Sequence, residues 1–158
     1  MTEVYPESLS IEQPHSSLHL DEAVLREAIR RVLAEEGATL VHLSVVLAGH
    51  ETVRRLNQSY LDHDYNTDVL SFSLRSPQDT APPDADEQAV EGEVYVDLDT
   101  AAERHEEFDT SFEREAYRYV LHGVLHLTGY DDATDAGRET MRQKENQYLD
   151  MIDVLPDV

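Results

Sequence analysis

Apolar residues recur along the chain with two different periods, and these periods predict its secondary structure. A period of three to four residues indicates an amphipathic helix, whereas a short apolar run or an alternation indicates a strand. The helical period predicts five helices: one between Asp21 and Gly37, and others at His50–Leu61, about 100–107, Ser111–Leu127 and Asp135–Met151. The second pattern predicts three strands, at Ala38–Ala48, Asp68–Leu74 and Gly92–Leu98.

Two segments fall outside these periods. Residues 1–20 show no clear period, and Pro6 and Pro14 disfavour a long helix there. Residues 75–91 contain three prolines, five acidic residues and few large apolar ones, which predicts a mobile acidic loop. Because helices and strands are mixed and no repeat is visible, we expect an α+β fold of two or three layers, in a single domain over residues 1–158.

The charge balance is strongly acidic. The chain has 34 acidic and 12 basic residues, a formal net charge of −22, and Lys144 is its single lysine. It therefore lacks the basic stripe of a general phosphate-backbone binder and the basic face of a protein that binds anionic membranes. An acidic, lysine-poor surface is expected of a halophilic protein, because high salt screens self-repulsion. An ordinary acidic protein is the alternative, and stability measured against salt separates the two.

The sequence also excludes some chemistry and some locations. There is no cysteine, which rules out disulfides, thiolate nucleophiles and cysteine-ligated zinc. The first residues resemble no signal peptide, and the longest apolar-leaning stretch, Leu40–Gly49, is far shorter than the ~20 residues of a membrane span. We therefore expect a soluble cytoplasmic protein without a membrane partner.

The segment His122–Asp132 carries the most informative chemistry. His122 and His126 are four residues apart on a predicted helix, so both imidazoles project from one face, as in two-histidine metal sites. A glycine three residues later lets the chain turn back, so that Asp132, or less favourably Asp131, can supply a third ligand. Two imidazoles and a carboxylate leave a fourth position open, which is typical of a catalytic zinc site. The alternative is a pair of half-exposed histidines that suit the helix dipole.

The spacing H-x-x-x-H-x-x-G-x-x-D is similar to that of the metzincin zinc proteases. Those proteases carry their general-base glutamate directly after the first histidine, where this chain has Gly123. The spacing therefore favours a metal site, while Gly123 makes a metzincin-like metallopeptidase the weaker hypothesis.

The same segment, HGVLHLTGYDD, resembles the signature H-G-x-L-H-L-x-G-Y-D-H of the YbeY family of bacterial metal-dependent endoribonucleases in all but the last place. Two further stretches resemble the family in the family's order along the chain. The first comprises Leu56 and Asn57 with Tyr60, followed by TDVLSF at residues 67–72, and the second is GEVYV at residues 92–96.

The resemblance implies a fold, a cofactor and a reaction. The implied fold is an α+β domain with a small mixed β-sheet covered by helices, and the implied cofactor is one zinc ion held by His122, His126 and Asp132. The implied function is a zinc-dependent endoribonuclease specific for single-stranded RNA. It would act on ribosomal RNA precursors and ribosomal particles, in 16S rRNA 3′-end maturation and ribosome quality control, and not on DNA. A ribosome-associated factor whose metal only organises the fold is the alternative from another class.

Two positions depart from the family pattern. Asp132 stands where the family mostly has histidine, although a carboxylate also binds zinc. Leu61 stands where the family usually has an arginine regarded as functionally important. Either an arginine from another position contacts the scissile phosphate, or the activity is weaker or different.

The remaining candidates have alternative roles. Arg118, one turn before His122, is a candidate phosphate clamp and Glu115 a candidate base, unless the two form an exposed pair on the helix. Asp68 and Ser71 are candidate cleft or substrate contacts, although Asp68 could simply cap the strand. The sequence assigns no catalytic residue. The arginines of the first half form either an anion-binding patch or pairs with neighbouring acids: Arg26, Arg30, Arg31, Arg54 and Arg55.

Overall fold

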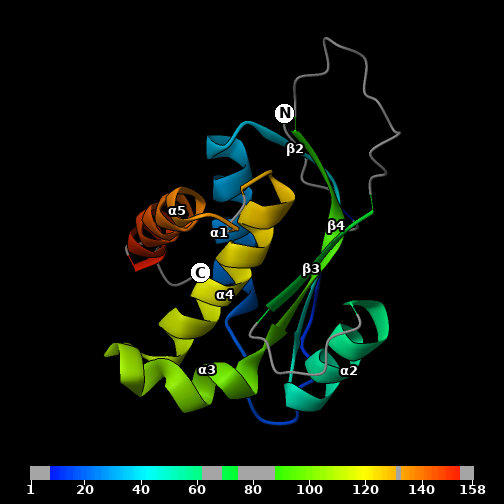
Figure 1. Ribbon diagram of the computed structural model, residues 1–158, viewed down its shortest axis with the longest axis vertical. Helices are drawn as coiled ribbons and strands as arrows, with labels where there is room; N and C mark the ends of the chain where they lie inside the picture. The colour runs from blue at the N-terminus through cyan, green and yellow to red at the C-terminus, as the bar shows by residue number, and fades with distance from the viewer. Residues whose placement is uncertain (1–7, 62–68, 75–87, 131–132, 154–158) are drawn as a thin grey trace.

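The computed structural model describes residues 8–61, 69–74, 88–130 and 133–153 (Figure 1). Its elements, in chain order, are β1 (Leu9–Glu12), α1 (Glu22–Glu35), β2 (Ala38–Ala48), α2 (His50–Leu61), β3 (Val69–Ser73), β4 (Gln88–Asp97), α3 (Leu98–Arg104), the 3₁₀ helix η2 (His105–Phe108), α4 (Phe112–Leu127) and α5 (Asp135–Asp153). Within these residues, no helix combines the length and apolar character that a membrane crossing requires. The mixture of helices and strands confirms the α+β class.

The four strands form one mixed sheet in the order β1-β2-β4-β3. β2 is parallel to both β1 and β4, whereas β3 runs antiparallel to β4. Because β2 and β4 are parallel, their last residues, Ala48 and Asp97, lie opposite each other at one edge of the sheet. Helix α2 starts just beyond the end of β2, and α3 follows β4 directly, so both helices begin at this edge.

The helices cover both faces of the sheet (Figure 1). On one face, Leu43, Val45 and Val94 pack into the main core together with residues of α1, α4 and α5. On the other face, Ala48 and Leu70 form a smaller cluster with residues of α2. The alternation of side chains along each strand thus divides the apolar residues between two layers of helices.

Local signals explain the helix boundaries. Asp21 accepts a hydrogen bond from the Val24 amide at 3.1 Å and caps α1, and Ser111 caps α4 through the Arg114 amide at 3.0 Å. Gly37 has a φ of 68°, the left-handed conformation that ends a helix. These boundaries agree with the sequence predictions.

Two predictions near the strands are wrong. No element is predicted in residues 1–20, yet Leu9–Glu12 forms β1 because it pairs with β2, with Leu9 beside Leu43. The predicted loop 75–91 ends too late, because β4 already begins at Gln88. Residues 75–87 of that loop lie outside the described residues.

One helix prediction is also too long. The predicted helix at 100–107 is α-helical only to Arg104, and the chain then tightens into η2. Asp109, with a φ of 56°, turns the chain into α4. A short, bent connection thus joins α3 to the N-terminal end of α4.

Four arginines of α1 and α2 pair with acids of their own helices. Arg30 and Arg31 both contact Glu27 at 2.6 Å, and Arg26 contacts Glu22 at 2.9 Å. Arg55 contacts Glu51 at 2.7 Å in the same way. These contacts favour charge neutralisation over an anion-binding patch in this part of the molecule.

Candidate metal centre and adjoining cavity

Helix α4 presents two histidines whose ring nitrogens converge. The Nε2 atoms of His122 and His126 lie 3.1 Å apart, with ring centroids 4.7 Å apart and ring planes at 77°. Two nitrogens bound to one tetrahedral zinc ion at 2.0–2.1 Å would lie roughly 3.3–3.4 Å apart. The pair therefore has nearly the separation that a shared zinc ion requires, and its donor set fits this metal.

Glu145 of α5 fixes the orientation of His122. Its carboxylate is buried and accepts a hydrogen bond from His122 Nδ1 at 2.6 Å. With the proton on Nδ1, the Nε2 atom keeps its lone pair on the side of His126, as a metal ligand must. The second carboxylate oxygen accepts a hydrogen bond from Arg118 at 2.9 Å, and Arg118 also donates to Asn146 at 2.9 Å. A carboxylate behind a histidine is the usual support of a metal-binding imidazole.

Gly123, directly after the first histidine, leaves no space for a side chain. A Cβ atom there would lie 2.6 Å from Cγ1 of Val94 and 3.1 Å from Oγ of Ser71. A glutamate at this position would force α4 away from the sheet. The metzincin arrangement is therefore incompatible with the packing of α4, which disfavours the metallopeptidase hypothesis.

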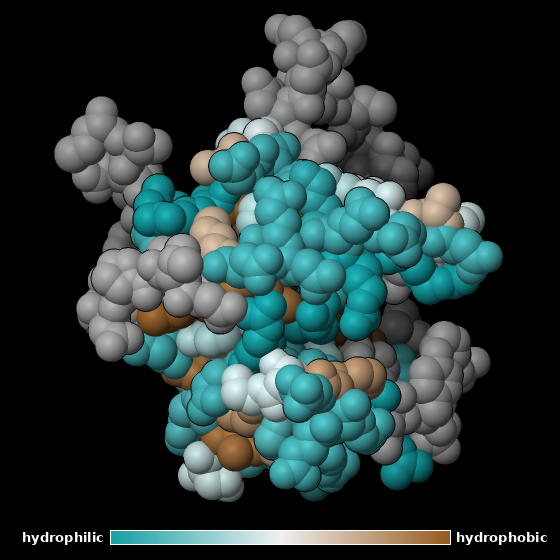
Figure 2. Space-filling view, turned by 90° about the vertical axis from the view of Figure 1, so that its left-hand side faces the viewer, coloured by the Kyte–Doolittle hydropathy of each residue, from teal (hydrophilic) through white to brown (hydrophobic). Residues whose placement is uncertain are grey.

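A cavity of about 600 Å³ opens beside His122, between η2, α4 and α5. The face that carries α5 is mainly hydrophilic, with hydrophobic surface in small separate patches (Figure 2). Five arginines line the cavity, namely Arg104, Arg114, Arg118, Arg138 and Arg142, together with three acids, Asp109, Glu115 and Glu145. In a chain with 34 acidic and 12 basic residues, this excess of arginine is a local reversal of charge. The cavity can therefore attract an anion toward the histidine pair.

The structure brings some predicted site residues together and leaves others undescribed. His122, His126 and Arg118 lie in one group on α4. Asp132 and Asp68 lie outside the described residues, so their roles stay predictions.

Ser71 and Glu115 have defined places beside this group. The Ser71 hydroxyl donates to the Gly123 carbonyl at 3.2 Å, which ties β3 to α4, and Ser71 is not one of the residues that line the cavity. Glu115 lines the cavity and is buried, and Arg118 pairs with Glu145 instead. The alternative of an exposed Glu115–Arg118 pair is therefore wrong.

The turn after α4 is anchored by a half-buried carboxylate, that of Glu36. The hydroxyl of Tyr130 donates to Glu36 at 2.7 Å, the hydroxyl of Tyr148 donates to the same carboxylate, and Lys144 Nζ lies 3.2 Å from it. Burial raises the pKa of Glu36, but these hydrogen bonds and the ammonium group outweigh it and hold the pKa below its ordinary value. The chain that leads to Asp132 thus leaves from a point fixed to α1 and α5.

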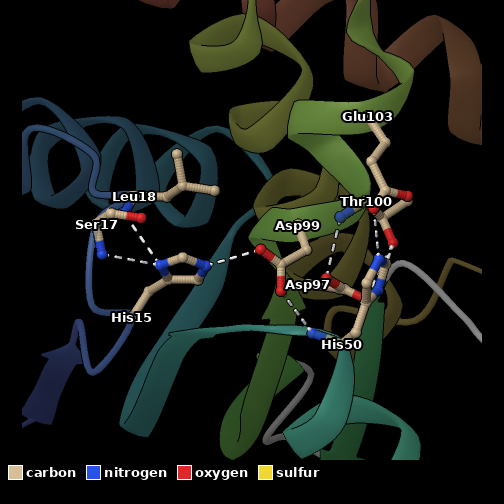
Figure 3. Close-up of polar contacts among 8 residues, drawn as sticks. All are labelled: His15, Ser17, Leu18, His50, Asp97, Asp99, Thr100 and Glu103. Atoms are coloured by element: carbon tan, nitrogen blue, oxygen red, sulfur yellow. Dashed lines mark hydrogen bonds and ion pairs between the residues drawn. The ribbon is translucent and has the colours of Figure 1, made fainter.

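A second group of titratable side chains lies at the edge where β2 and β4 end (Figure 3). His50, Asp97 and Asp99 each place one possible ligand atom within 4.8 Å of the others, so by spacing they could hold a metal ion. Sequence reasoning missed this group. The available signal was that His50 comes just after the end of β2, while Asp97 and Asp99 lie at and just after the end of β4, the parallel neighbour of β2.

Hydrogen bonds already engage both ring nitrogens of His50 (Figure 3). Nδ1 lies 2.7 Å from Asp97 and Nε2 lies 2.9 Å from Glu103, while the His50 amide donates to Asp99 at 3.0 Å. The hydrogen bond to Glu103 raises the pKa of His50, burial lowers it and Asp97 raises it further, with a net increase. A metal ion at this group would have to displace one of these contacts, and in the arrangement described here the group is a hydrogen-bond and ion-pair network that ties α2 to α3.

The fold and the site define a class of α+β protein in which a two-histidine candidate metal centre adjoins an arginine-lined cavity. A family model described as Endoribonuclease YbeY matches residues 10–153. The chain is similar to the endoribonuclease YbeY of Salinibacter ruber, with 66% identity over 149 residues that cover 94% of each chain. It is also similar to that of Chlorobium phaeovibrioides, with 42% identity over 130 residues, 82% of this chain and 81% of the relative.

A solved structure agrees with these matches. The solution structure of TM1509 from Thermotoga maritima is 29% identical, covers 91% of this chain and 88% of its own, and superposes with a TM-score of 0.62. The chain belongs to the YbeY endoribonuclease family. The resemblance found in the sequence motifs is thereby confirmed.

Proposed function

We propose that the chain is a zinc-dependent endoribonuclease specific for single-stranded RNA, with His122, His126 and Asp132 as ligands of one zinc ion. The observation that carries the proposal is the histidine pair, whose Nε2 atoms lie 3.1 Å apart with Glu145 behind His122, in a chain of an endoribonuclease family. When bound, zinc supplies a Lewis acid for the phosphoryl oxygen and makes a bound water more acidic.

The side chains of the chain itself divide the remaining tasks. Glu145 keeps the proton on Nδ1 of His122, so that Nε2 stays available as a ligand. The arginines of the cavity bind and orient the phosphates of the strand, which compensates for the leucine at position 61. Glu115, buried at the cavity wall, is the candidate proton acceptor for the attacking hydroxyl, whether that hydroxyl belongs to water or to the ribose. Products that end in a 2′,3′-cyclic phosphate would identify the ribose 2′-hydroxyl as the nucleophile.

We propose ribosomal RNA precursors and ribosomal particles as the partners, in the cytoplasm, with 16S rRNA 3′-end maturation and ribosome quality control as the processes. Support comes from the sequence motifs, which resemble the family over residues 56–132, and from the family match over residues 10–153. We also propose that residues 1–158 act as one endoribonuclease domain, because the family match spans nearly all of them.

Elemental analysis combined with an RNA cleavage assay tests the assignment. The purified chain should contain one zinc ion per molecule and cleave an unpaired oligoribonucleotide faster than the same sequence in a duplex. His122→Ala and Asp132→Ala should lose both the zinc and the cleavage, because each removes a ligand. His19→Ala, which changes an exposed histidine, is the matched control and should keep both.

His50→Ala distinguishes the histidine pair of α4 from the His50 group, the two candidate metal groups among the described residues. It should retain zinc, because His50 belongs to the ion-pair network and not to the proposed centre. Zinc that is lost in His50→Ala and kept in His122→Ala would overturn the assignment. If His126→Ala lowered stability but left the cleavage rate unchanged, the metal would be structural and the ribosome-associated factor would be the better description.

A further inference from the structure

The charge of the cavity is not fully neutralised by the protein itself. Arg118 is paired with Glu145, Arg114 lies 3.2 Å from Asp150, Arg138 contacts Asp135, and Arg104 lies 3.8 Å from Glu107. Arg142, from the exposed side of α5, also lines the cavity and makes no ion pair or side-chain hydrogen bond with any residue that the structure describes. It is therefore a cation at the cavity wall that is available to an incoming anion.

An aromatic ring stands at the same wall. Large exposed hydrophobic side chains in the described part of the chain are Val41, Leu74 and Phe108, and of these Phe108 lines the cavity. Phe108 is 47% exposed, and the guanidinium of Arg104 lies 5.0 Å from its ring centroid. The left-handed turn at Asp109 directly after it holds this end of η2 at the cavity. An exposed phenylalanine beside cations is the combination with which proteins bind unpaired nucleotides.

We propose that Phe108 and Arg142 form a nucleotide-binding subsite, in which an unpaired RNA base stacks on the Phe108 ring and its phosphate pairs with Arg142. This subsite rests on the proposed function, because His122 lines the same cavity, so a strand bound in it runs toward the proposed zinc centre. A base within a duplex has both faces covered by its neighbours and cannot stack on the ring. The subsite thus supplies a physical reason for single-strand specificity.

Two features of the cavity wall, its charge and its aromatic ring, indicate that the ligand is a nucleic acid strand. Arg142 brings to the cavity wall a positive charge that no described acid pairs with, so an acidic ligand is favoured there. The aromatic wall requires in addition a flat apolar group next to the charge. A single-stranded RNA provides both at every nucleotide.

Phe108→Trp gives a direct reading of the stacked base. The chain has no tryptophan, so the variant carries a single indole, whose fluorescence is quenched when a nucleobase stacks on it. The protein as purified is mixed rapidly with a short single-stranded oligoribonucleotide, and the signal is read before turnover. We expect quenching by the single strand, but not by an abasic oligomer of the same length or by a duplex. Val41→Trp, at an exposed position outside the cavity, should show no quenching.

Affinity measurements separate the two contacts. Phe108→Ala should weaken binding of the single strand roughly five- to hundred-fold, the usual effect of losing one stacked base. Arg142→Gln should lower the slope of log affinity against log salt by about 0.7, which is the expected change for one phosphate contact on a single strand. Arg31→Gln, an exposed arginine already paired with Glu27, is the matched control and should change neither quantity.

The outcomes distinguish the subsite from the nuclease assignment. Preparations that cleave RNA normally, with no quenching of Phe108→Trp and no loss of affinity in Phe108→Ala, would overturn the subsite and leave the proposed function intact. Quenching by single strands without any cleavage by the unmodified chain would support the subsite and overturn the proposed function. Equal quenching by the abasic oligomer would show that no base stacks on the ring, which also overturns the subsite.

Discussion

At the scale of single residues, Gly123 decides how closely α4 approaches the sheet. Val94, which a Cβ atom at this position would meet at 2.6 Å, is fully buried and β-branched, so it has few alternative rotamers. Ser71 closes the same contact from β3 through its hydrogen bond to the Gly123 carbonyl. The backbone position of His122, the preceding residue, is therefore set by packing between helix and sheet.

Replacement of this glycine by alanine should destabilise the protein by up to about 2 kcal/mol. The overpacking cost, typically about 1–3 kcal/mol, exceeds the gain in helix propensity of about 1 kcal/mol. Urea unfolding of Gly123→Ala against the unmodified protein measures the difference. Gly137→Ala, which adds the same methyl group near the start of α5, is the control for the change in helix propensity. A stability of Gly123→Ala equal to or above that of the unmodified protein would show that α4 does not pack as closely as described.

At the scale of elements, the sequence predicted the long, periodic segments. It missed the strand that forms only by pairing with a segment distant in the chain. α1, β2, α2 and α4 agree with their apolar patterns and caps. β1 has only four residues, and its pairing with β2 comes from a segment some thirty residues away. A local pattern cannot report such a pairing.

In the candidate site, too, the features set by local helix geometry were predicted and those set by tertiary packing were not. The i,i+4 spacing predicted that His122 and His126 would share a face, because that follows from helix geometry alone. The support from Glu145 was not predictable, because it depends on how α5 packs across α4, 23 residues further along the chain. The His50 network was missed for a similar reason, since it required the parallel alignment of β2 and β4.

The His50 network makes the contact between α2 and α3 depend on pH. The pKa of His50 is raised above its ordinary value of 6.5. A raised pKa in the folded state means that the stabilisation is fully present below the ordinary value and is lost as the pH rises through the folded-state value. The contact of α2 with α3 should therefore weaken as the pH rises above the ordinary value and through the raised folded-state pKa of His50. Asp99, beside the same network, behaves oppositely: burial raises its pKa, but hydrogen bonds from His15 and the His50 amide outweigh this and lower it.

His50→Gln tests the pH dependence. The free energy of unfolding of the unmodified protein should exceed that of the variant by about 0.5 kcal/mol at roughly pH 5.5, and the gap should shrink at roughly pH 8.5, because partly exposed ion pairs contribute about 0–1 kcal/mol. Urea titrations at the two pH values give the comparison, with His19→Gln as the exposed-histidine control. A gap that is constant, or larger at the higher pH, would contradict a raised pKa of His50 in the folded protein.

At the scale of the whole molecule, the positions of the few basic residues matter more than the net charge. Residues 92–158 contain 17 acidic and six basic residues. Five of those six, all arginines, line the cavity beside His122. The acidic remainder repels nucleic acid at long range, so binding depends on this short-range concentration of arginine and on the centre next to it.

The same acidity predicts that salt stabilises the fold. At low ionic strength the Debye length reaches ~30 Å, so the negative charges repel one another across the molecule, whereas ~3 Å at 1 M removes this repulsion. The melting temperature should therefore rise steadily from dilute buffer to about 1 M sodium chloride. The variant Glu35→Gln/Glu106→Gln/Glu113→Gln removes three exposed acids that form none of the ion pairs described for the protein, so it should melt higher in dilute buffer and gain less from salt. A melting temperature that does not change with salt in either protein would leave an ordinary acidic protein as the correct description, and the halophilic hypothesis would fail.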